Sequence, residues 1–177
     1  ISKKEPVSYD MIVKICEKYV CVNANLSELR VAAICVTAFY AFLRFNEIAG
    51  LRCCDLTFCT TDGVKFVELY IVKSKTDVYR NGSKVLLAYR GGLVCPYGIL
   101  RRYAQTANIL LSSSENLFSK VYYIASSDCY KLRPGGLSYS RTREIVLQAF
   151  ESLGYSKRKF GLHSLRSGVL RLPQTPG

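Results

Sequence analysis

The chain has 177 residues, 49% of them hydrophobic, which suits one domain with a substantial core and argues against a disordered chain. Its 25 Lys and Arg outnumber its 13 Asp and Glu, so the net charge of +12 predicts a polyanionic partner, with nucleic acid favoured over a membrane. A basic surface that only keeps the chain soluble is the alternative. The longest apolar run, 31–43, is too short to span a bilayer, so we expect no transmembrane segment.

The excess positive charge is concentrated in two segments. Residues 1–60 carry seven basic and six acidic groups, which nearly balance. Residues 73–102 carry seven basic groups and one acidic group, and residues 131–177 carry nine and two. This distribution is what an electrostatic footprint for phosphates requires.

The eight cysteines predict neither a disulfide scaffold nor a zinc site. The chain is not short, we expect no signal peptide before it, and the cysteine spacing matches no zinc pattern. We expect reduced thiols in an intracellular protein, buried as small hydrophobic side chains, and no metal centre.

Two helices are predicted in the first quarter of the chain. Apolar residues recur at helical spacing from Tyr9 to Val20, which indicates an amphipathic helix. After a polar break, Ser27 is the expected N-cap of the second helix, with Glu28 early in its first turn. Residues 29–42 are apolar on nearly every face, so we expect this helix to be buried at the centre of the domain.

Three short β-rich runs follow, separated by two turn signals, Asp62-Gly63 and Asn81-Gly82, whose glycines allow the positive φ of tight hairpins. The runs predict a small antiparallel meander with strands at 56–59, 65–73 and 83–88. Three basic residues then lie at or near the tip of the second hairpin: Lys73, Lys75 and Arg80.

Two further helices are predicted in the second half. The first opens at Cys95-Pro96 and runs to about Asn108, and the second covers 140–153 and stops at Gly154. Between them, 117–124 reads as a short strand or an extended segment. We expect loops at 112–114 and 126–138. Prolines 173 and 176 forbid a long helix after Arg166, so 169–177 is expected to be a tail.

Arg44 directly follows the long apolar helix, where a charge is costly unless it is used or paired. Glu47 lies three residues further on, within reach on a helix. Both an ordinary Arg–Glu pair at a helix boundary and a functional arginine fit this pattern.

His163 and Arg166 are spaced i, i+3, so at the start of a helix they share one face. An imidazole that exchanges a proton and a guanidinium that grips two phosphate oxygens would then act on one cluster of atoms. Lys75 can supply a proton to a leaving oxygen, with Lys73 as its main competitor for that role. The alternatives are a solvated helix end and a solvated turn.

In this order, Leu43-Arg44-x-x-Glu47, a hairpin Lys75 and His163-x-x-Arg166 resemble the catalytic domain of the tyrosine recombinases, the phage-integrase family. The phrases Ser74-Lys75-Thr76-Asp77 and His163-Ser164-Leu165-Arg166-Ser167 look most like the versions in eukaryotic mobile elements of the Crypton or DIRS type. The resemblance covers residues 3–168. It implies an α+β, mainly helical DNA breaking-rejoining fold with a small three-stranded antiparallel sheet.

The resemblance also implies a role for each matching residue. Arg44 and Arg166 would hold the non-bridging oxygens of the scissile phosphate, and Lys75 would protonate the departing 5′ oxygen. His163 would assist proton transfer, and Glu47 would support the site from behind. Further contacts to the DNA backbone are expected from six other basic residues of the two segments: Lys73, Arg80, Arg141, Lys157, Arg158 and Lys159.

The family resemblance implies double-stranded DNA as the partner and neither a metal nor a nucleotide cofactor. For a full-length parent protein it implies a homo-oligomer assembled on DNA, and in a eukaryote a nuclear location.

The chain departs from the family after the second arginine. In the family a tyrosine follows and attacks the phosphate to form a covalent intermediate. Here no His, Trp or Tyr follows Arg166, and the last of the 13 tyrosines is Tyr155. We therefore expect a chain truncated before the nucleophile, as a fragment, an aberrantly spliced product or a decayed copy, and inactive in strand cleavage alone.

Two other functions compete with this interpretation. One is a non-catalytic DNA-binding module that uses the basic segments only for backbone contact. The other is an RNA-binding domain, which the sequence supports less because it lacks an aromatic-rich RNP-like strand pattern.

Overall fold

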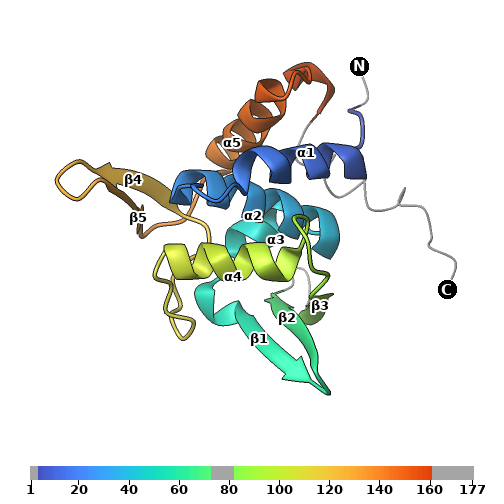
Figure 1. Ribbon diagram of the computed structural model, residues 1–177, viewed down its shortest axis with the longest axis vertical. Helices are drawn as coiled ribbons and strands as arrows, with labels where there is room; N and C mark the ends of the chain where they lie inside the picture. Colours follow the sequence, from blue (N-terminus) through green and yellow to red (C-terminus); the bar gives the residue numbers. More distant parts are fainter. Residues whose placement is uncertain (1–3, 73–81, 161–177) are drawn as a thin grey trace, which may run out of the picture.

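The computed structural model describes residues 4–72 and 82–160, which form a mainly helical α+β fold (Figure 1). The helices are α1 (Tyr9–Tyr19), α2 (Leu26–Ala41), α3 (Phe45–Gly50), α4 (Pro96–Thr106) and α5 (Tyr139–Ser152). A three-stranded antiparallel sheet consists of β1 (Leu56–Thr61), β2 (Val64–Ile71) and β3 (Ser83–Ala88). A separate hairpin pairs β4 (Lys120–Ile124) with β5 (Cys129–Arg133), and two 3-10 turns lie at Cys53–Asp55 and Lys157–Lys159. The predicted fold class is confirmed.

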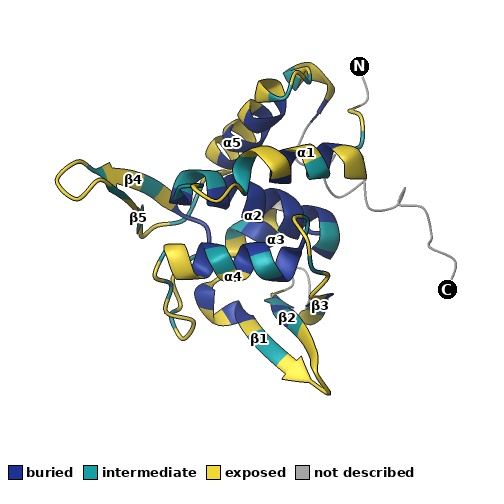
Figure 2. Cartoon of the chain, in the orientation of Figure 1, coloured by how far each residue is buried: buried dark blue, intermediate teal, exposed yellow. Residues whose placement is uncertain are grey.

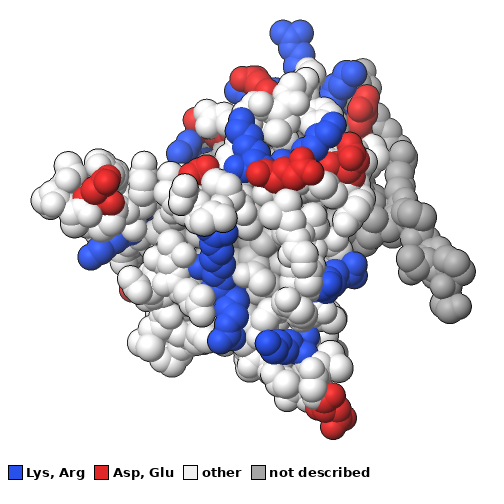
Figure 3. Space-filling view, in the orientation of Figure 1, with Lys and Arg blue, Asp and Glu red and all other residues white. Residues whose placement is uncertain are grey.

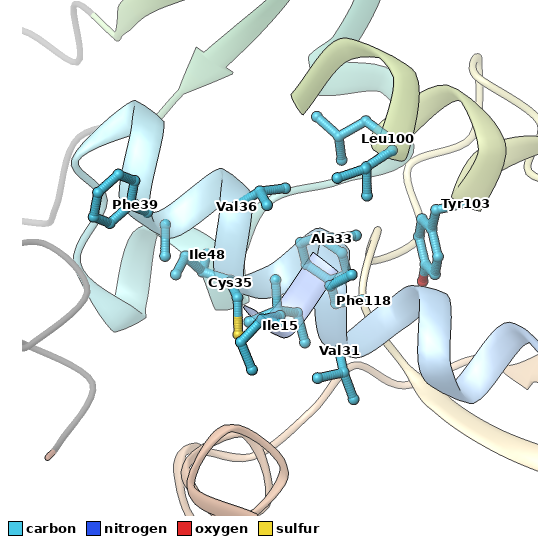
Figure 4. Close-up of a cluster of buried hydrophobic side chains, with 14 of the residues drawn as sticks. Ile15, Val31, Ala33, Cys35, Val36, Phe39, Ile48, Leu100, Tyr103 and Phe118 are labelled. Atoms are coloured by element: carbon cyan, nitrogen blue, oxygen red, sulfur yellow. The ribbon is translucent and has the colours of Figure 1, made fainter. Parts of the chain in front are cut away.

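Helix α2 lies at the centre and is buried on almost every side (Figure 2). Thirteen of its 16 residues are buried, and it contacts α1, α4, α5, β3 and β5. Figure 4 shows Ala33, Cys35, Val36 and Phe39 of this helix within the hydrophobic cluster, together with residues of the surrounding elements. No described helix has the length and apolar composition to cross a membrane.

The start of α2 differs from the prediction, which placed the N-cap at Ser27. The cap is Asn25, whose side-chain oxygen accepts the Glu28 N–H at 2.9 Å, while the Glu28 carboxylate accepts the Asn25 N–H at 3.1 Å. This reciprocal pair satisfies two backbone donors at once, which a cap at Ser27 would not do. The helix therefore begins three residues earlier than the apolar run at Leu29.

The three-stranded meander confirms the predicted strand order. Strands β1 and β2 pair from Leu56↔Leu69 to Thr61↔Val64, and the turn between them places Asp62 and Gly63 at φ of 51° and 78°. Alternate residues of β2 are buried, with Val67, Leu69 and Ile71 facing the core. Asn81 of the second predicted turn lies outside the described residues.

Residues 126–138 are not a continuous loop, which corrects the sequence prediction. Cys129–Arg133 forms strand β5 and pairs with β4 from Lys120↔Arg133 to Ile124↔Cys129. Asp128 adopts the left-handed φ of 48° that lets the chain reverse. The polar run Ser126-Ser127-Asp128 directly before β5 favoured a loop in the sequence prediction.

All eight cysteine sulfurs are free, and four of them are buried as predicted: Cys16, Cys35, Cys53 and Cys95. Burial raises the pKa of the Cys16 thiol to about 12, with a smaller contribution from Glu17. Cys21 and Cys54 are exposed, so the expectation of burial was wrong for these two. The described residues contain no group of three or more His, Cys, Asp or Glu arranged to hold a metal ion.

The first prediction concerns the packing of α2. Ile34 is fully buried, so Ile34→Ala should lower the free energy of unfolding by about 2 to 5 kcal/mol through lost burial and a residual cavity. Urea denaturation followed by far-UV circular dichroism measures this change. As a control, Val22→Ala at a position that is 93% exposed should leave the free energy within about 0.5 kcal/mol of wild type. Equal effects of the two substitutions would contradict the central position of α2.

Candidate nucleic-acid interface

The sequence placed Arg44 directly after the long apolar helix. In the structure, Phe42 and Leu43 separate it from α2, and it lies immediately before α3. Helix α2 stops at Ala41 because Phe42 turns into the left-handed region at φ 57°, and the Leu43 N–H donates to the Ala38 carbonyl at 3.3 Å. Leu43 is buried and anchors the connection. Arg44 then adopts an extended backbone as the residue before α3, and its side chain is exposed. The guanidinium is therefore exposed to solvent next to the core.

Glu47 holds the backbone at Arg44. Its carboxylate accepts the Arg44 N–H at 2.8 Å, and its own N–H donates to the Arg44 carbonyl at 3.1 Å. Within residues 4–72 and 82–160, the Arg44 guanidinium has no salt bridge with Glu47 or with any other carboxylate. The sequence allowed either an ordinary Arg–Glu ion pair or a functional arginine. The ion pair is not formed among the described residues, and the Glu47 carboxylate binds the main-chain N–H of Arg44.

The other predicted catalytic residues, Lys75, His163 and Arg166, lie outside the described residues, as do Lys73 and Arg80. Their convergence on Arg44 stays a prediction. The structure does describe the chain on either side of them. Ile71 of β2 pairs with Ser83 of β3 at the ends that flank the segment with Lys75. Phe160, directly before the segment with His163, is buried against Phe150 at a ring distance of 5.7 Å.

The described part of the first basic segment uses its cations for local contacts. Lys84 pairs with Glu68 at 3.2 Å, and the Arg90 guanidinium lies 4.8 Å from the centre of the Tyr40 ring. Two more contacts involve α4: Arg101 lies 5.6 Å from the Phe58 ring, and Arg102 donates to the carbonyls of Cys21 at 2.7 Å and Val22 at 3.0 Å. Some of the basic side chains that the sequence analysis assigned to DNA binding therefore hold neighbouring structural elements together.

The basic residues predicted around α5 lie at its two ends. Arg141 is in the first turn and pairs with Glu144 at 3.2 Å, whereas Lys157 follows the helix and pairs with Glu151 at 3.4 Å. The ten residues from 141 to 151 correspond to about 15 Å of helix. Arg158 and Lys159 are exposed beside Lys157. Such exposed pairs contribute little to stability, so all four cations remain open to a ligand. A single phosphate cannot touch both ends.

A buried arginine that the sequence prediction missed adds charge near Arg141. Arg30 in α2 is only 4% exposed, and its Nη1 donates to the Ser119 carbonyl at 2.8 Å. Its Nε has no partner among the described atoms. Burial lowers the pKa of Arg30, Tyr103 opposes this, and the nearby charge of Arg141 lowers it further. The only sequence signal was a lone cation within an apolar helix.

Figure 3 shows how the charges are distributed over one face. Basic and acidic side chains mingle over α1, while basic ones predominate over α4 and the sheet below it. Strands β4 and β5 carry three more exposed cations: Lys131 and Arg133, which belong to the second basic segment, and Lys120, which the sequence prediction did not assign to DNA. The sequence signal for Lys131 and Arg133 was their place in the basic segment 131–177.

The second prediction separates the roles of Arg44 and Glu47. Glu47→Ala removes the acceptor of the Arg44 N–H and should lower the free energy of unfolding by roughly 1 kcal/mol. Arg44→Ala should change it by less than about 0.5 kcal/mol, because the exposed side chain has no ion pair in the described part of the chain. Urea denaturation of both variants measures the difference. A larger loss for Arg44→Ala than for Glu47→Ala would show that the arginine serves the fold.

No family model matches the chain, and no curated protein matches its sequence. Solved structures do match in fold. The XerH site-specific recombinase bound to its difH substrate superimposes with a TM-score of 0.61 at 16% identity, over 96% of this chain and 42% of that one. The FLP recombinase in a Holliday junction complex superimposes with a TM-score of 0.56 at 11% identity, over 96% of this chain and 40% of that one.

The lambda integrase (residues 75–356) bound to DNA gives a TM-score of 0.54 at 17% identity, over 97% of this chain and 51% of that one. The chain thus spans about half or less of the length of these recombinases. The similarity to these structures extends over 96% or more of this chain. The described residues therefore have the fold of the tyrosine recombinase catalytic domain.

Proposed function

We propose that the chain is a DNA-binding domain of the tyrosine recombinase family, derived from machinery for DNA integration and recombination by transesterification. The observation that carries this proposal is the presentation of Arg44. Its guanidinium is exposed next to the end of the central helix, and Glu47 fixes its backbone, within a fold shared with recombinases solved as DNA complexes. A cation presented in this way is suited to a phosphate oxygen, because no described carboxylate competes for its guanidinium donors.

In this proposal each residue has one chemical task. Arg44 and Arg166 neutralise the two non-bridging oxygens of a scissile phosphate, and their charge stabilises the extra negative charge of the transition state. Lys75 donates a proton to the departing 5′ oxygen, and His163 assists proton transfer. Glu47 positions Arg44 and does not touch the phosphate. Lys73, Arg80, Arg141 and the cations at 157–159 contact the backbone of duplex DNA.

The covalent step requires a nucleophile that these 177 residues do not supply after Arg166. We propose that the stretch binds the phosphate but does not cleave the strand alone, and that its parent belongs with eukaryotic mobile elements of the Crypton or DIRS type. A nuclear location and assembly of a full-length parent into a homo-oligomer on DNA belong to the same proposal.

The exposed cations outside the Arg44 site also fit a second candidate, a non-catalytic DNA-binding module descended from a mobile-element recombinase. Both candidates bind duplex DNA, but only the first gives Arg44 a special role. Loss of affinity on Arg44→Ala that is no larger than the loss on removing another exposed cation, such as Lys18, would favour the module.

The third prediction is salt-sensitive, weakly sequence-specific binding to duplex DNA. The plot of log affinity against log salt concentration should fall with a slope of about −0.9 for each phosphate neutralised, because bound cations release counterions. Fluorescence anisotropy with two unrelated duplexes of equal length, in salt from about 50 to 200 mM, measures the slope and the sequence preference. Affinity that stayed constant over this range would contradict DNA backbone binding.

The fourth prediction concerns strand cleavage. A suicide DNA substrate, which traps a covalent intermediate by losing its leaving strand, should give no protein–DNA adduct with residues 1–177. Denaturing gel electrophoresis of the incubated mixture detects an adduct by its retarded migration. An adduct that mass spectrometry mapped to any of the 13 tyrosines would overturn the proposed inactivity.

A further inference from the structure

The β4–β5 hairpin extends from the body of the protein as a two-stranded arm (Figure 1). In an antiparallel pair, residues directly opposite each other point to the same face, and successive pairs point to opposite faces. The register of the hairpin therefore sorts its side chains into two sets. One face carries Lys120 with Arg133, Tyr122 with Lys131 and the partly exposed Ile124 with Cys129, and the other carries Val121 with Leu132 and Tyr123 with Tyr130.

The second of these faces is accounted for by the fold. Val121 and Leu132 are partly buried against the hydrophobic core. Beyond them, the rings of Tyr123 and Tyr130 stack at 5.1 Å, and the Tyr123 hydroxyl donates to Asp128 at 2.6 Å. Asp128, the one acidic residue in the sequence of the hairpin, is thus engaged next to this apolar face. It does not neutralise the cations of the other face.

The face with Lys120, Lys131, Arg133 and Tyr122 is called here the cationic face. All four side chains are exposed, and none of the three cations has an ion pair with a described carboxylate. Lys120 and Arg133 stand directly opposite each other. Like charges in this arrangement destabilise a hairpin, and an anion between them would relieve the repulsion.

Positive charge also gathers at the base of the hairpin. Ser119, next to Lys120, accepts a hydrogen bond from the buried Arg30 through its carbonyl, and its hydroxyl accepts the Gly136 N–H at 3.3 Å. These bonds tie the first residue of the arm and the segment after β5 to the central helix. The arm is therefore anchored at both strands, so its cations are held at a defined position.

We propose that the cationic face of the β4–β5 hairpin is a contact surface for the backbone of duplex DNA, separate from the Arg44 site. This inference rests on the proposed function and adds to it a second point of attachment. Residues 131 and 133 lie about 7 Å apart along a strand, and DNA carries one negative charge per roughly 1.7 Å of helix axis, so several phosphates fit this span. An anionic membrane fits less well, because Tyr122 is the only exposed large hydrophobic side chain on the cationic face.

The test is a charge-neutralised hairpin, Lys120→Gln, Lys131→Gln and Arg133→Gln together, in the full chain. Anisotropy with a labelled duplex should show the slope of log affinity against log salt reduced by up to about 2.7, or about 0.9 per lost contact. The single variant Lys131→Gln should reduce the same slope by up to about 0.9. Because like charges are removed, the thermal unfolding midpoint should equal or exceed that of wild type.

The matched control is Lys4→Gln, Lys14→Gln and Lys18→Gln, which removes the same charge from exposed residues on and before α1. Lys14 already pairs with Asp10 at 3.3 Å. We expect this variant to change the slope by less than about 1, because these cations contact no phosphate.

Four outcomes would overturn the inference. If wild type binds with a steep salt dependence and the hairpin variant matches it, the hairpin inference falls and the proposed function stands. If wild type shows no salt-dependent binding, both fall. If the control variant reduced the salt slope as much as the hairpin variant does, the reduction would be due to net charge and not to contacts of the hairpin. Loss of binding to phosphatidylserine vesicles with DNA binding unchanged would assign the face to a lipid surface.

Discussion

The burial of α2 on nearly every side is the constraint on which the rest of the structure depends. A helix that is surrounded in this way cannot carry charge along its length, because each buried charge would need a partner that the apolar neighbours do not provide. The charged residues of α2, Glu28 and Arg30, are therefore confined to its first turns, and the next charge follows only after the helix has ended. Arg30 in the early turns reaches a carbonyl of the chain before β4, and Arg44 emerges after the left-handed turn at Phe42. The same packing that stabilises the domain thus determines where its cations appear.

Two kinds of cation result, and they differ in what a ligand would have to displace. Arg90 and Arg102 already contact an aromatic ring or main-chain carbonyls, so a phosphate that bound them would have to share or replace those contacts. Arg44 and the cationic face of the hairpin have no such partner among the residues that the structure describes. A phosphate gains the full charge-assisted hydrogen bond there, because only water is displaced. Net charge alone does not distinguish these two classes.

The sequence predicts best the features that depend on local patterns. The continuous apolar run predicted the buried helix, and Asp62-Gly63 predicted the first hairpin, because backbone conformation there follows from a few neighbouring residues. The sequence analysis missed the cap at Asn25 and the strand Cys129–Arg133. The cap depends on the side chain of Glu28, and the strand depends on pairing with β4. The contact of Arg102 with Val22 could not be predicted, because it joins residues 80 positions apart. For the candidate site, the sequence identified Arg44 and Glu47 as neighbours but left open whether the carboxylate pairs with the guanidinium, whereas the structure shows it bound to the Arg44 main-chain N–H.

That last difference changes how the site works. If Glu47 neutralised the Arg44 guanidinium, a phosphate would have to compete with a carboxylate for the same hydrogen-bond donors. Because the carboxylate instead accepts the main-chain N–H, it fixes the direction in which the side chain leaves the backbone and leaves the guanidinium donors unoccupied by that carboxylate. The position of the Arg44 backbone is then set during folding, through the packing of Leu43 and the short helix α3. A ligand that binds Arg44 therefore meets a side chain that starts from a fixed point and has no described carboxylate to displace, which is the physical basis for assigning phosphate chemistry to an exposed residue in a basic domain.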